Sequence, residues 1–324
     1  MKIAFFGLEK EDQAVFSDVF EGTEVLFFEE KLDENTVVKA RNVNVVCVFV
    51  DSTVNQTVID AIPNLKFIAT RSTGLNHIAC DYAKTKGVQV SYVPGYGSHT
   101  VAEFTFGLIL NLSRKIIIAN DYITQTLDFN YNSKMQGFNL AGKTLGVIGT
   151  GKIGKNVVKI AKGFEMNVIA YDHYPDEVFA KETGVVFKNF DDIITDSDII
   201  SLHAPFVQEN FHLINKENIQ KMKKGVYLFN TARGELIDTA ALLFGLREGI
   251  IAGAGLDVLE GEKDLKANIA SNFTSLNKEL MKMPNVIITP HTAFYTLEAV
   301  AEIYKITILN LQAFLANAPI NLVK

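Results

Sequence analysis

Three side chains that could do acid–base chemistry come shortly after three predicted strands of this sequence: Arg233, Glu262 and His291. The carboxyl ends of parallel strands meet at one edge of a sheet, so we expect the three to gather there. An arginine can hold a carboxylate and polarise a carbonyl, a histidine can supply a proton, and a neighbouring carboxylate favours the protonated imidazole. The set therefore suits proton transfer to the carbonyl of a small oxo acid.

Each of these residues also has an ordinary structural explanation. Arg233 could form a surface ion pair, His291 could cap a helix, and Glu262 could belong to a solvated acidic cluster with Glu260. Because all three follow strands of one predicted sheet, the catalytic interpretation is the stronger one.

A glycine-rich segment supplies a second candidate site. Gly149, Gly151 and Gly154 have the G-x-G-x-x-G spacing, between the predicted strand 145–148 and the predicted helix 155–161. Glycines allow a tight turn and close approach of the backbone to a pyrophosphate, and the free amides at the helix start face its negative charge. The segment therefore predicts a dinucleotide site.

Asp172 indicates which dinucleotide binds. It lies eighteen positions after Gly154, directly after the strand 168–171, where a carboxylate can accept hydrogen bonds from the ribose hydroxyls. This favours NAD over NADP. The alternatives are an acidic residue that caps the next turn and a methyltransferase with a similar glycine pattern. A predicted NAD site combined with the arginine, the histidine and the glutamate indicates an oxidoreductase. Such an enzyme would transfer a hydride to or from a small 2-oxo or 2-hydroxy acid.

The elements that must hold these residues alternate between strands and helices. Apolar runs such as 45–50 and 67–70 alternate with helical patterns up to residue 91, and a second series runs from 144 to 289, with strands near 145–148, 168–171, 199–202, 227–230, 253–256 and 286–289. This predicts an α/β fold with two domains, each a parallel sheet flanked by helices.

The segment 93–97 breaks regular structure and indicates a crossing between domains. Thr100 to Glu103 has the capping-box spacing and predicts the start of an apolar, buried helix. The segment 297–316 predicts one long helix that returns the chain to the first domain. We therefore expect a substrate domain of residues 1–97 plus 297–324 and an NAD-binding domain of residues 98–296.

Composition excludes several classes of protein. The net charge of -6 and the lack of basic runs argue against nucleic acid or an anionic membrane as a partner. No apolar stretch approaches the roughly 20 residues of a membrane helix, and no signal peptide is evident, so we expect a cytoplasmic protein. Cys47 and Cys80 suit buried free thiols in a reducing compartment, and no metal site is expected.

Several longer segments carry a resemblance to one family. They are Arg71-Ser72-Thr73-Gly74, 147–154, 230–235, 255–262 and His291-Thr292-Ala293-Phe294-Tyr295-Thr296 with the preceding Thr289-Pro290. On these segments the chain resembles the D-isomer-specific 2-hydroxyacid dehydrogenases over nearly its whole length, especially their D-lactate dehydrogenase branch. The resemblance implies a flavodoxin-like substrate domain, a Rossmann NAD-binding domain, a cleft between them that closes on substrate, and a homodimer.

The resemblance also implies roles for individual residues. Arg233 would bind the substrate carboxylate and carbonyl, His291 would be the acid/base, and Glu262 would be the partner of the histidine. On the substrate side it implies Thr73, Gly74, Tyr96 and Phe294. Near the nicotinamide amide it implies Thr231, Ala232 and Asp257, and along the rest of the NAD site Gly149, Gly151, Lys152, Ile153, Gly154, Asp172, Ala204, Pro205 and Asn210.

One difference from the family bears on the identity of the substrate. Where some D-lactate dehydrogenases have an aromatic residue after the strand that matches 45–50, this sequence has Asp51-Ser52, and a carboxylate there would disfavour anionic side chains. Phe294 suggests a small apolar pocket. Alternatives to a pyruvate-like substrate are glyoxylate, hydroxypyruvate or a larger 2-oxo acid.

Formate oxidation is disfavoured because the related formate dehydrogenases carry glutamine at the position of Glu262. An NAD(H)-sensing binding protein, like the corepressors of this fold, is the rival from a different class.

Overall fold

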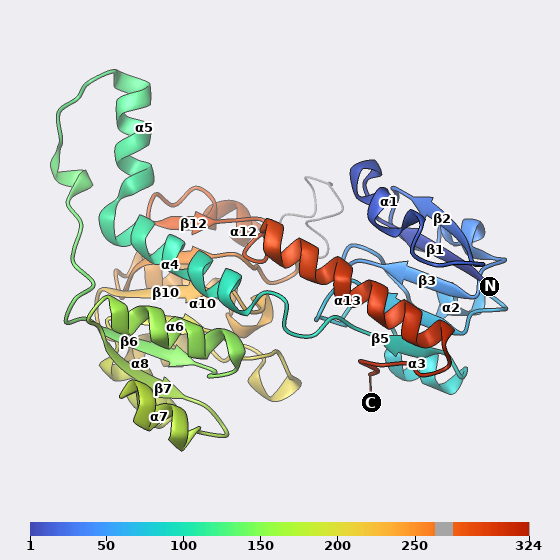
Figure 1. The fold of residues 1–324 in the computed structure, drawn as a ribbon. Coiled ribbons are helices and arrows are strands. Elements are labelled where there is room, and N and C mark those ends of the chain that lie inside the picture. Colours follow the sequence, from blue (N-terminus) through green and yellow to red (C-terminus); the bar gives the residue numbers. More distant parts are fainter. Residues whose placement is uncertain (263–274, 324) are drawn as a thin grey trace. The chain divides into compact units, whose positions relative to one another are not determined.

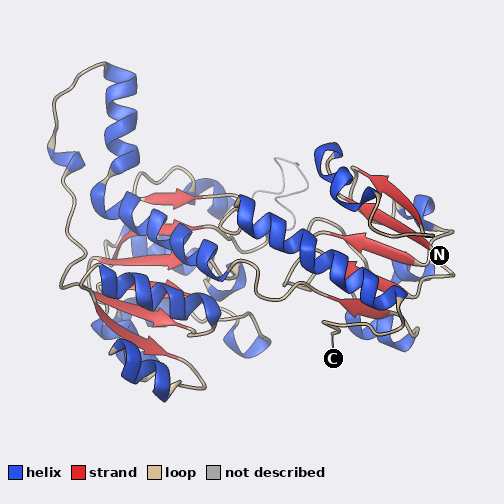
Figure 2. Cartoon of the chain, viewed as in Figure 1, coloured by secondary structure: helices blue, strands red, loops and turns tan. Residues whose placement is uncertain are grey.

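The computed structural model of this chain describes residues 1–262 and 275–323. It separates into two compact units, Met1–Tyr96 with Thr296–Lys324 and Gly97–Tyr295. The predicted divisions lie one residue from these bounds. Both units are parallel sheets with helices on their faces (Figure 2), which confirms the predicted fold class.

The first unit is built on five parallel strands in the order β2-β1-β3-β4-β5. These are β1 (Lys2–Phe6), β2 (Glu24–Phe28), β3 (Val45–Val48), β4 (Phe67–Thr70) and β5 (Gln89–Ser91). The helices of this unit are α1 (Lys10–Ser17), the 3-10 turn η1 (Val37–Ala40), α2 (Gln56–Asp60), α3 (Cys80–Thr85) and α13 (Leu297–Leu315).

Alternating side chains of these strands fill two cores. Ile3 and Phe5 point to the face that carries Phe16 of α1 and Leu311 of α13. The intervening residues of the same strand belong to the opposite core, beneath α2 and α3. This period of two is the geometry of a strand that is buried on both faces. The long helix after residue 296 therefore packs on the first unit, as its sequence pattern predicts.

The second unit is built on seven parallel strands in the order β12-β11-β10-β9-β6-β7-β8. They are β6 (Thr144–Ile148), β7 (Asn167–Tyr171), β8 (Val186–Phe187), β9 (Ile199–Leu202), β10 (Val226–Asn230), β11 (Ile251–Leu256) and β12 (Val286–Ile288). Its helical elements are α4 (Ser98–Arg114), α5 (Ile116–Thr126), η2 (Ser133–Met135), α6 (Lys152–Gly163), α7 (Glu177–Thr183), α8 (Phe190–Asp196), η3 (Gln208–Asn210), α9 (Lys216–Lys221), η4 (Gly234–Leu236), α10 (Thr239–Arg247) and α12 (Ser275–Leu280).

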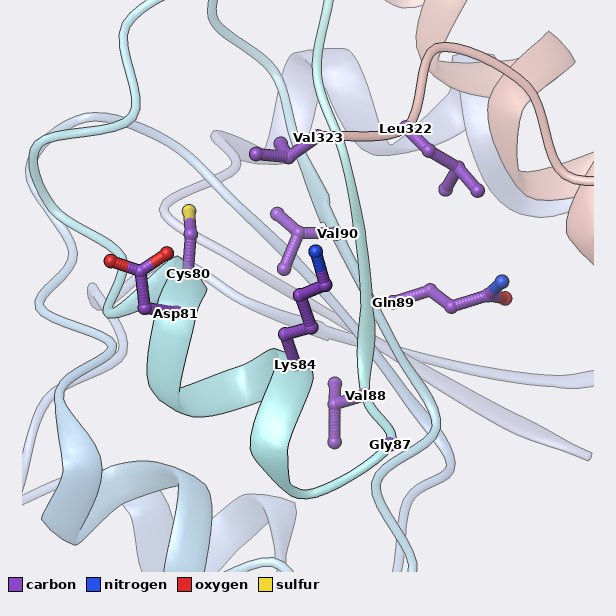
Figure 3. A pocket seen from close by; sticks show the side chains of 9 residues that line it. All are labelled: Cys80, Asp81, Lys84, Gly87, Val88, Gln89, Val90, Leu322 and Val323. Carbon is purple, nitrogen blue, oxygen red and sulfur yellow. The ribbon is translucent and has the colours of Figure 1, made fainter.

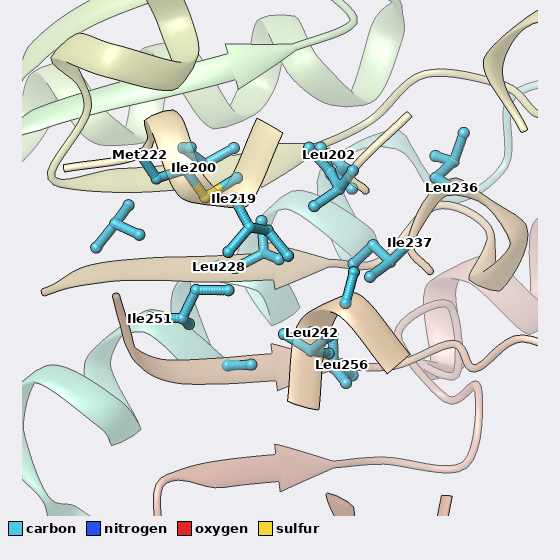
Figure 4. Close-up of a cluster of buried hydrophobic side chains, with 14 of the residues drawn as sticks. Ile200, Leu202, Ile219, Met222, Leu228, Leu236, Ile237, Leu242, Ile251 and Leu256 are labelled. Atoms are coloured by element: carbon cyan, nitrogen blue, oxygen red, sulfur yellow. The ribbon is translucent and has the colours of Figure 1, made fainter. Parts of the chain in front are cut away.

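Two helical layers cover this sheet. On one face, Leu228 and Leu256 of the strands meet Ile219 of α9 and Leu242 of α10 (Figure 4). On the other face, α4 lies beside α6 and both contribute to the core (Figure 1). The predicted buried helix is therefore α4, which packs against its own unit.

The strand order fixes where a ligand can bind. From β6 the chain proceeds outward to β7 and β8, then returns to β9 on the other side of β6. The chain continues from β6 to α6 on one face of the sheet and from β9 to α9 on the other. The carboxyl end of the sheet at such a point is where open α/β sheets bind ligands. The glycine-rich segment follows β6.

Two local predictions differ from the structure. The helix α4 begins at Ser98, with Gly97 as its N-cap residue, so Thr100 and Glu103 lie inside the helix and form no capping box. The edge strand β8 is missing from the predicted set because it has only two residues. Among the described residues no helix is long and apolar enough to cross a bilayer.

Candidate active site

His291 and Glu262 form a close pair in the second unit. Nδ1 of His291 lies 2.8 Å from Oε1 of Glu262, and about a quarter of each side chain is exposed. Glu262 comes after β11 and His291 after β12, which is the neighbouring strand. The pair can hold a proton on the imidazole while leaving Nε2 as the second ring nitrogen for proton transfer.

The segment that carries His291 is held by Asp257, which directly follows β11. One oxygen of this buried carboxylate accepts hydrogen bonds from the Thr289 hydroxyl at 2.6 Å and the Thr292 amide at 2.9 Å, and the other accepts the Ala293 amide at 2.9 Å. The amide of His291 donates to the backbone oxygen of Asp257. Burial raises the pKa of Asp257, and these hydrogen bonds offset only part of that effect.

This arrangement shapes the backbone at the histidine. His291 has a φ of +56°, in the left-handed region that non-glycine residues seldom adopt. The amides on both sides of it are fixed by Asp257, so the surrounding contacts stabilise this conformation. Sequence reasoning placed Asp257 near the nicotinamide but missed that it organises the turn of the histidine.

Arg233 lies in the loop after β10, next to β11 in the sheet. Its Nη1 donates to the backbone oxygen of Ala232 at 2.6 Å. Asn230 stabilises the loop, because its side chain donates to the Arg233 carbonyl and accepts from the Ala232 amide. The adjacent Gly234 has no room for a Cβ atom. The three predicted catalytic residues therefore follow three consecutive strands, β10, β11 and β12.

The glycine-rich turn has the geometry that its spacing predicts. Gly149 has a φ of +92°, and a Cβ there would lie 2.6 Å from the amide nitrogen of Ala204, in the loop after β9. A Cβ on Gly154 would lie 2.0 Å from the backbone oxygen of Gly149. Lys152 and Ile153 are the first residues of α6. The glycines therefore bring β6, α6 and the β9 loop together at the switch point of the sheet.

Asp172 closes the same turn from the end of β7. Its Oδ2 accepts from the Thr150 amide at 2.6 Å and the Thr150 hydroxyl at 2.9 Å, and its Oδ1 accepts from the Tyr174 amide. Partial burial raises the pKa of this carboxyl, but these hydrogen bonds and His173 outweigh that effect and hold it below its ordinary value. Asp172 is therefore an anion beside the glycine turn, as binding of ribose hydroxyls requires.

Other predicted cofactor residues have defined local contacts. Asn210 holds the loop after β9, because its amide donates to the Pro205 oxygen and its oxygen accepts from Val207. The hydroxyl of the buried Thr231 lies 3.0 Å from that of Thr105 in α4. These contacts fix the backbone of two loops that carry predicted cofactor residues.

The predicted substrate residues are divided between the two units. Thr73, Gly74 and Tyr96 belong to the first unit, and Phe294 to the second. The Thr73 hydroxyl donates to the Val93 oxygen at 2.6 Å. The backbone oxygen of Gly74 accepts a hydrogen bond from the Ser72 hydroxyl.

The expected absence of an aromatic residue after the strand 45–50 is wrong. The strand β3 ends at Val48, so Phe49 is the residue that follows it, and the Arg71 guanidinium lies 5.7 Å from the centre of its ring. The apolar run 45–50 concealed this end because Phe49 and Val50 continue the pattern. Ser52, taken as part of the missing aromatic position, is buried and accepts from the Leu32 amide.

A separate pocket in the first unit lies among α3, β5 and the C-terminal segment, and Lys84 and Val90 point into it (Figure 3). None of the predicted catalytic or cofactor residues lines it. Cys80, which does, is half-buried and not buried as expected, whereas Cys47 is fully buried. Burial, followed by the charge of Asp81, raises the pKa of the Cys80 thiol, which makes it a poor nucleophile.

Comparisons with known proteins show what the chain is similar to. Residues 106–293 match the family model of the D-isomer-specific 2-hydroxyacid dehydrogenase NAD-binding domain. The chain is 38% identical to the D-lactate dehydrogenase of Escherichia coli K12 over 319 residues, which is 96% of each chain. It is 39% identical to an aromatic 2-oxoacid reductase of Clostridium sporogenes over 322 residues, with 97% of this chain and 96% of the relative covered.

Solved structures give the same picture. The D-lactate dehydrogenase of Aquifex aeolicus, in complex with NAD and lactic acid, matches 98% of this chain and 96% of its own with a TM-score of 0.88 and 36% identity. A D-2-hydroxyisocaproate dehydrogenase matches 100% of this chain and 99% of its own with a TM-score of 0.86 and 32% identity.

Proposed function

Because this chain belongs to the family of D-isomer-specific 2-hydroxyacid dehydrogenases, which use NAD, we propose that it reduces a small, pyruvate-like 2-oxo acid to the D-2-hydroxy acid. The observation that carries the proposal is the 2.8 Å contact between His291 and Glu262, one strand away from the loop of Arg233. When bound, NADH supplies the hydride that the carbonyl carbon receives.

In this proposal His291 supplies the proton. Its Nδ1 donates to Glu262, so Nε2 carries the proton that passes to the carbonyl oxygen as the C–H bond forms and the C=O π bond breaks. The product is a neutral hydroxyl group and a neutral imidazole. The negative charge of Glu262 favours the imidazolium before the transfer, which prepares the site for reduction.

Arg233 is proposed to orient the substrate. A guanidinium can bind the substrate carboxylate and polarise its carbonyl, which stabilises the negative charge that develops on the oxygen. The amides of Thr73 and Gly74 are proposed as further donors to the carboxylate. Tyr96 and Phe294 are proposed as substrate neighbours, in keeping with the family resemblance.

The proposed NAD site is the glycine turn with the ends of the neighbouring strands. Asp172 would accept the ribose hydroxyls and repel a 2′-phosphate. Its support is the anionic carboxylate held beside Thr150. The remaining proposed residues line the turn and the ends of β9, β10 and β11: Gly149, Gly151, Lys152, Ile153, Gly154, Ala204, Pro205, Asn210, Thr231, Ala232 and Asp257.

The side chain of the substrate is proposed to be small and uncharged, with larger apolar 2-oxo acids as the main alternative. Phe49 supports this preference, because it follows β3 at the same sheet edge as Thr73 and Gly74. Asp51 would disfavour an anionic side chain. The alternative of a larger substrate is supported by the relative named as an aromatic 2-oxoacid reductase.

A panel of 2-oxo acids tests the proposal. Pyruvate, glyoxylate, hydroxypyruvate, 2-oxoisocaproate and phenylpyruvate would each be offered with NADH and with NADPH, and the chirality of the product would be determined. We expect the highest kcat/KM with pyruvate and NADH and a D product. Tight NADH binding without turnover of any acid would instead favour a nucleotide-sensing protein.

We also propose a cytoplasmic homodimer. Free thiols at Cys47 and Cys80 suit a reducing compartment. The helix α5 buries none of its residues, and after it Leu127, Phe129 and Tyr131 are 88 to 92% exposed. Figure 1 shows α5 projecting from its own sheet. An exposed apolar patch of this kind suits a protein interface, and light scattering of Phe129→Ser against the unaltered chain would test it.

A further inference from the structure

His212 links two loops that carry proposed catalytic residues. Its backbone amide donates to the backbone oxygen of Glu235 at 2.9 Å, in the loop that begins with Arg233. Its ring Nε2 lies 2.7 Å from Oε1 of Glu260, two positions before Glu262. One residue therefore contacts the Arg233 loop through its backbone and the Glu262 turn through its side chain.

The conformation of His212 is unusual for a histidine. Its φ of +52° lies in the left-handed region, where non-glycine residues are strained. The imidazole ring stacks on the ring of Phe211, with centroids 3.8 Å apart and planes inclined by 20°. The contacts at both ends stabilise this backbone conformation, which directs the ring toward Glu260.

Glu260 lies in the middle of a tight turn. The Glu262 amide donates to the Leu259 oxygen at 3.2 Å, and Gly261 at the third position has a φ of +74°. The second oxygen of Glu260 accepts from the Thr239 hydroxyl, at the start of α10, at 3.2 Å. The carboxylate is thus held from two elements, and it fixes the orientation of the turn that ends at Glu262.

A close backbone contact attaches the turn to the Arg233 loop. A Cβ on Gly234 would lie 2.1 Å from the carbonyl carbon of Leu259 and 2.4 Å from the amide nitrogen of Glu260. The backbones of the two segments are therefore in direct contact. A small displacement of the turn would also displace the Arg233 loop.

We propose that His212 and Glu260 are positioning residues, which keep the turn 259–262 in place so that the Glu262 carboxylate stays on Nδ1 of His291. This inference rests on the proposed acid–base role of His291. The two side chains are 29% and 32% exposed, and such a pair contributes little to the stability of a fold. The second acidic neighbour of the ring, Asp238, is 4.0 Å away and caps α10.

Four variants of this 324-residue chain test the proposal. Glu260→Ala removes the carboxylate that contacts His212 and Thr239 and so leaves the turn without these two contacts. His212→Gly removes the ring while suiting the positive φ, so it separates loss of the contact from backbone strain. Glu260→Gln is the conservative rescue, because its amide can accept from His212 and donate to Thr239. Lys221→Gln is the matched control, because it breaks an exposed ion pair of the same unit with Glu217.

We expect Glu260→Ala and His212→Gly each to lower kcat for 2-oxo acid reduction about tenfold, because small misplacements of catalytic groups have large effects. Both should retain the NADH dissociation constant and move the pH profile in the same direction as Glu262→Gln. Glu260→Gln and Lys221→Gln should remain near the unaltered protein. In a Glu262→Ala background, which lacks any side-chain contact with Nδ1 of His291, Glu260→Ala should cause no further loss, because Glu260 is proposed to act only through that contact.

Either of two results would overturn the positioning role and leave the proposed catalytic pair standing. One is an unaltered kcat and pH profile in Glu260→Ala, and the other is a full additional loss when Glu260→Ala is added to the Glu262→Ala variant. Unaltered kinetics in Glu262→Gln would instead overturn the proposed catalytic pair, and this inference with it. Thermal unfolding of each variant separates loss of folding from loss of positioning.

Discussion

The Nδ1 atom of His291 lies 2.8 Å from Oε1 of Glu262, although 29 positions separate the two residues in the chain. Adjacent parallel strands bring them together, and the carboxylate of Asp257 fixes the turn on which the histidine lies. The contact determines which ring nitrogen remains for chemistry, because Nδ1 is occupied.

Glu262→Gln should separate the charge of the glutamate from its hydrogen bond. The amide oxygen can still accept from Nδ1, but the imidazolium loses a neighbouring negative charge. The limb of the reduction profile that declines with rising pH should therefore move toward lower pH. The measurement is kcat/KM for the best 2-oxo acid as a function of pH.

Glu217→Gln is the control for that experiment, because it removes a carboxylate from an exposed pair with Lys221. A limb that stays in place in Glu262→Gln would mean that another carboxylate serves the histidine, with Glu260 as the first to test.

His291→Asn should abolish most turnover without loss of cofactor binding. Asparagine tolerates the positive φ of this position better than alanine does, so the turn is preserved. Loss of a general acid typically costs about 10² to 10⁴ in rate. Stopped-flow turnover and NADH fluorescence titration give the two quantities, and a kcat within a few fold of the unaltered protein would rule out the assignment.

Asp172→Asn should relax the choice between NADH and NADPH. The variant keeps an oxygen that can accept from Thr150 but lacks the charge that repels a 2′-phosphate. The ratio of kcat/KM for NADPH to that for NADH should rise about tenfold, in line with the loss of one charge-assisted hydrogen bond. Asp191→Asn, an exposed residue of α8, should leave the ratio unchanged. A ratio unaltered in both variants would contradict the role of Asp172.

Sequence reasoning located the catalytic candidates because their positions follow from strand ends alone. His291, Glu262 and Arg233 each come after a segment that the alternation of strands and helices predicts to be a strand, and the carboxyl ends of parallel strands meet at one edge of the sheet. The glycine turn can also be predicted from the sequence, since the strand, the glycines and the helix are contiguous there.

What the sequence did not indicate depends on contacts between distant segments. The three hydrogen bonds of Asp257 reach residues 32 to 36 positions away, and local patterns carry no trace of them. The end of β3 was misplaced because Phe49 continues an apolar run. The positive φ of His212 is a property of its surroundings, since histidine itself does not favour that region.

Gly154→Ala should damage both folding and cofactor binding. The new methyl group would lie 2.0 Å from the Gly149 oxygen, so the turn must move. Overpacking of this kind costs on the order of 2 kcal/mol in the free energy of unfolding, and a displaced turn should weaken NADH binding.

Gly163→Ala is the matched control, because it lies in the same helix with open space around its Cβ position. Its thermal stability should be equal or slightly higher, since alanine has the better helix propensity. Equal losses of stability in the two variants would show that steric contact with Gly149 is not the cause.

His203→Gln should weaken the dependence of stability on acid. Part of the residue reaches the surface, but its Nδ1 is buried without a hydrogen-bond partner among the described residues, while Nε2 lies 2.8 Å from the Ser201 hydroxyl. Desolvation by burial lowers the pKa of His203 to about 3. An unfolded histidine titrates near pH 6.5, so below that pH the unfolded state binds a proton that the folded state lacks.

The free energy of unfolding should therefore fall as the pH drops from about 6.5 to about 3, with a slope of up to about 1.4 kcal/mol per pH unit from this residue alone. Glutamine does not titrate, so chemical denaturation at pH 7, 6, 5 and 4 should show a shallower decline in His203→Gln than in the unaltered protein. His99→Gln, at an exposed site of α4, should retain the original slope. Equal slopes in all three proteins would mean that the folded state accommodates a protonated His203, which would require the ring to be hydrated in solution.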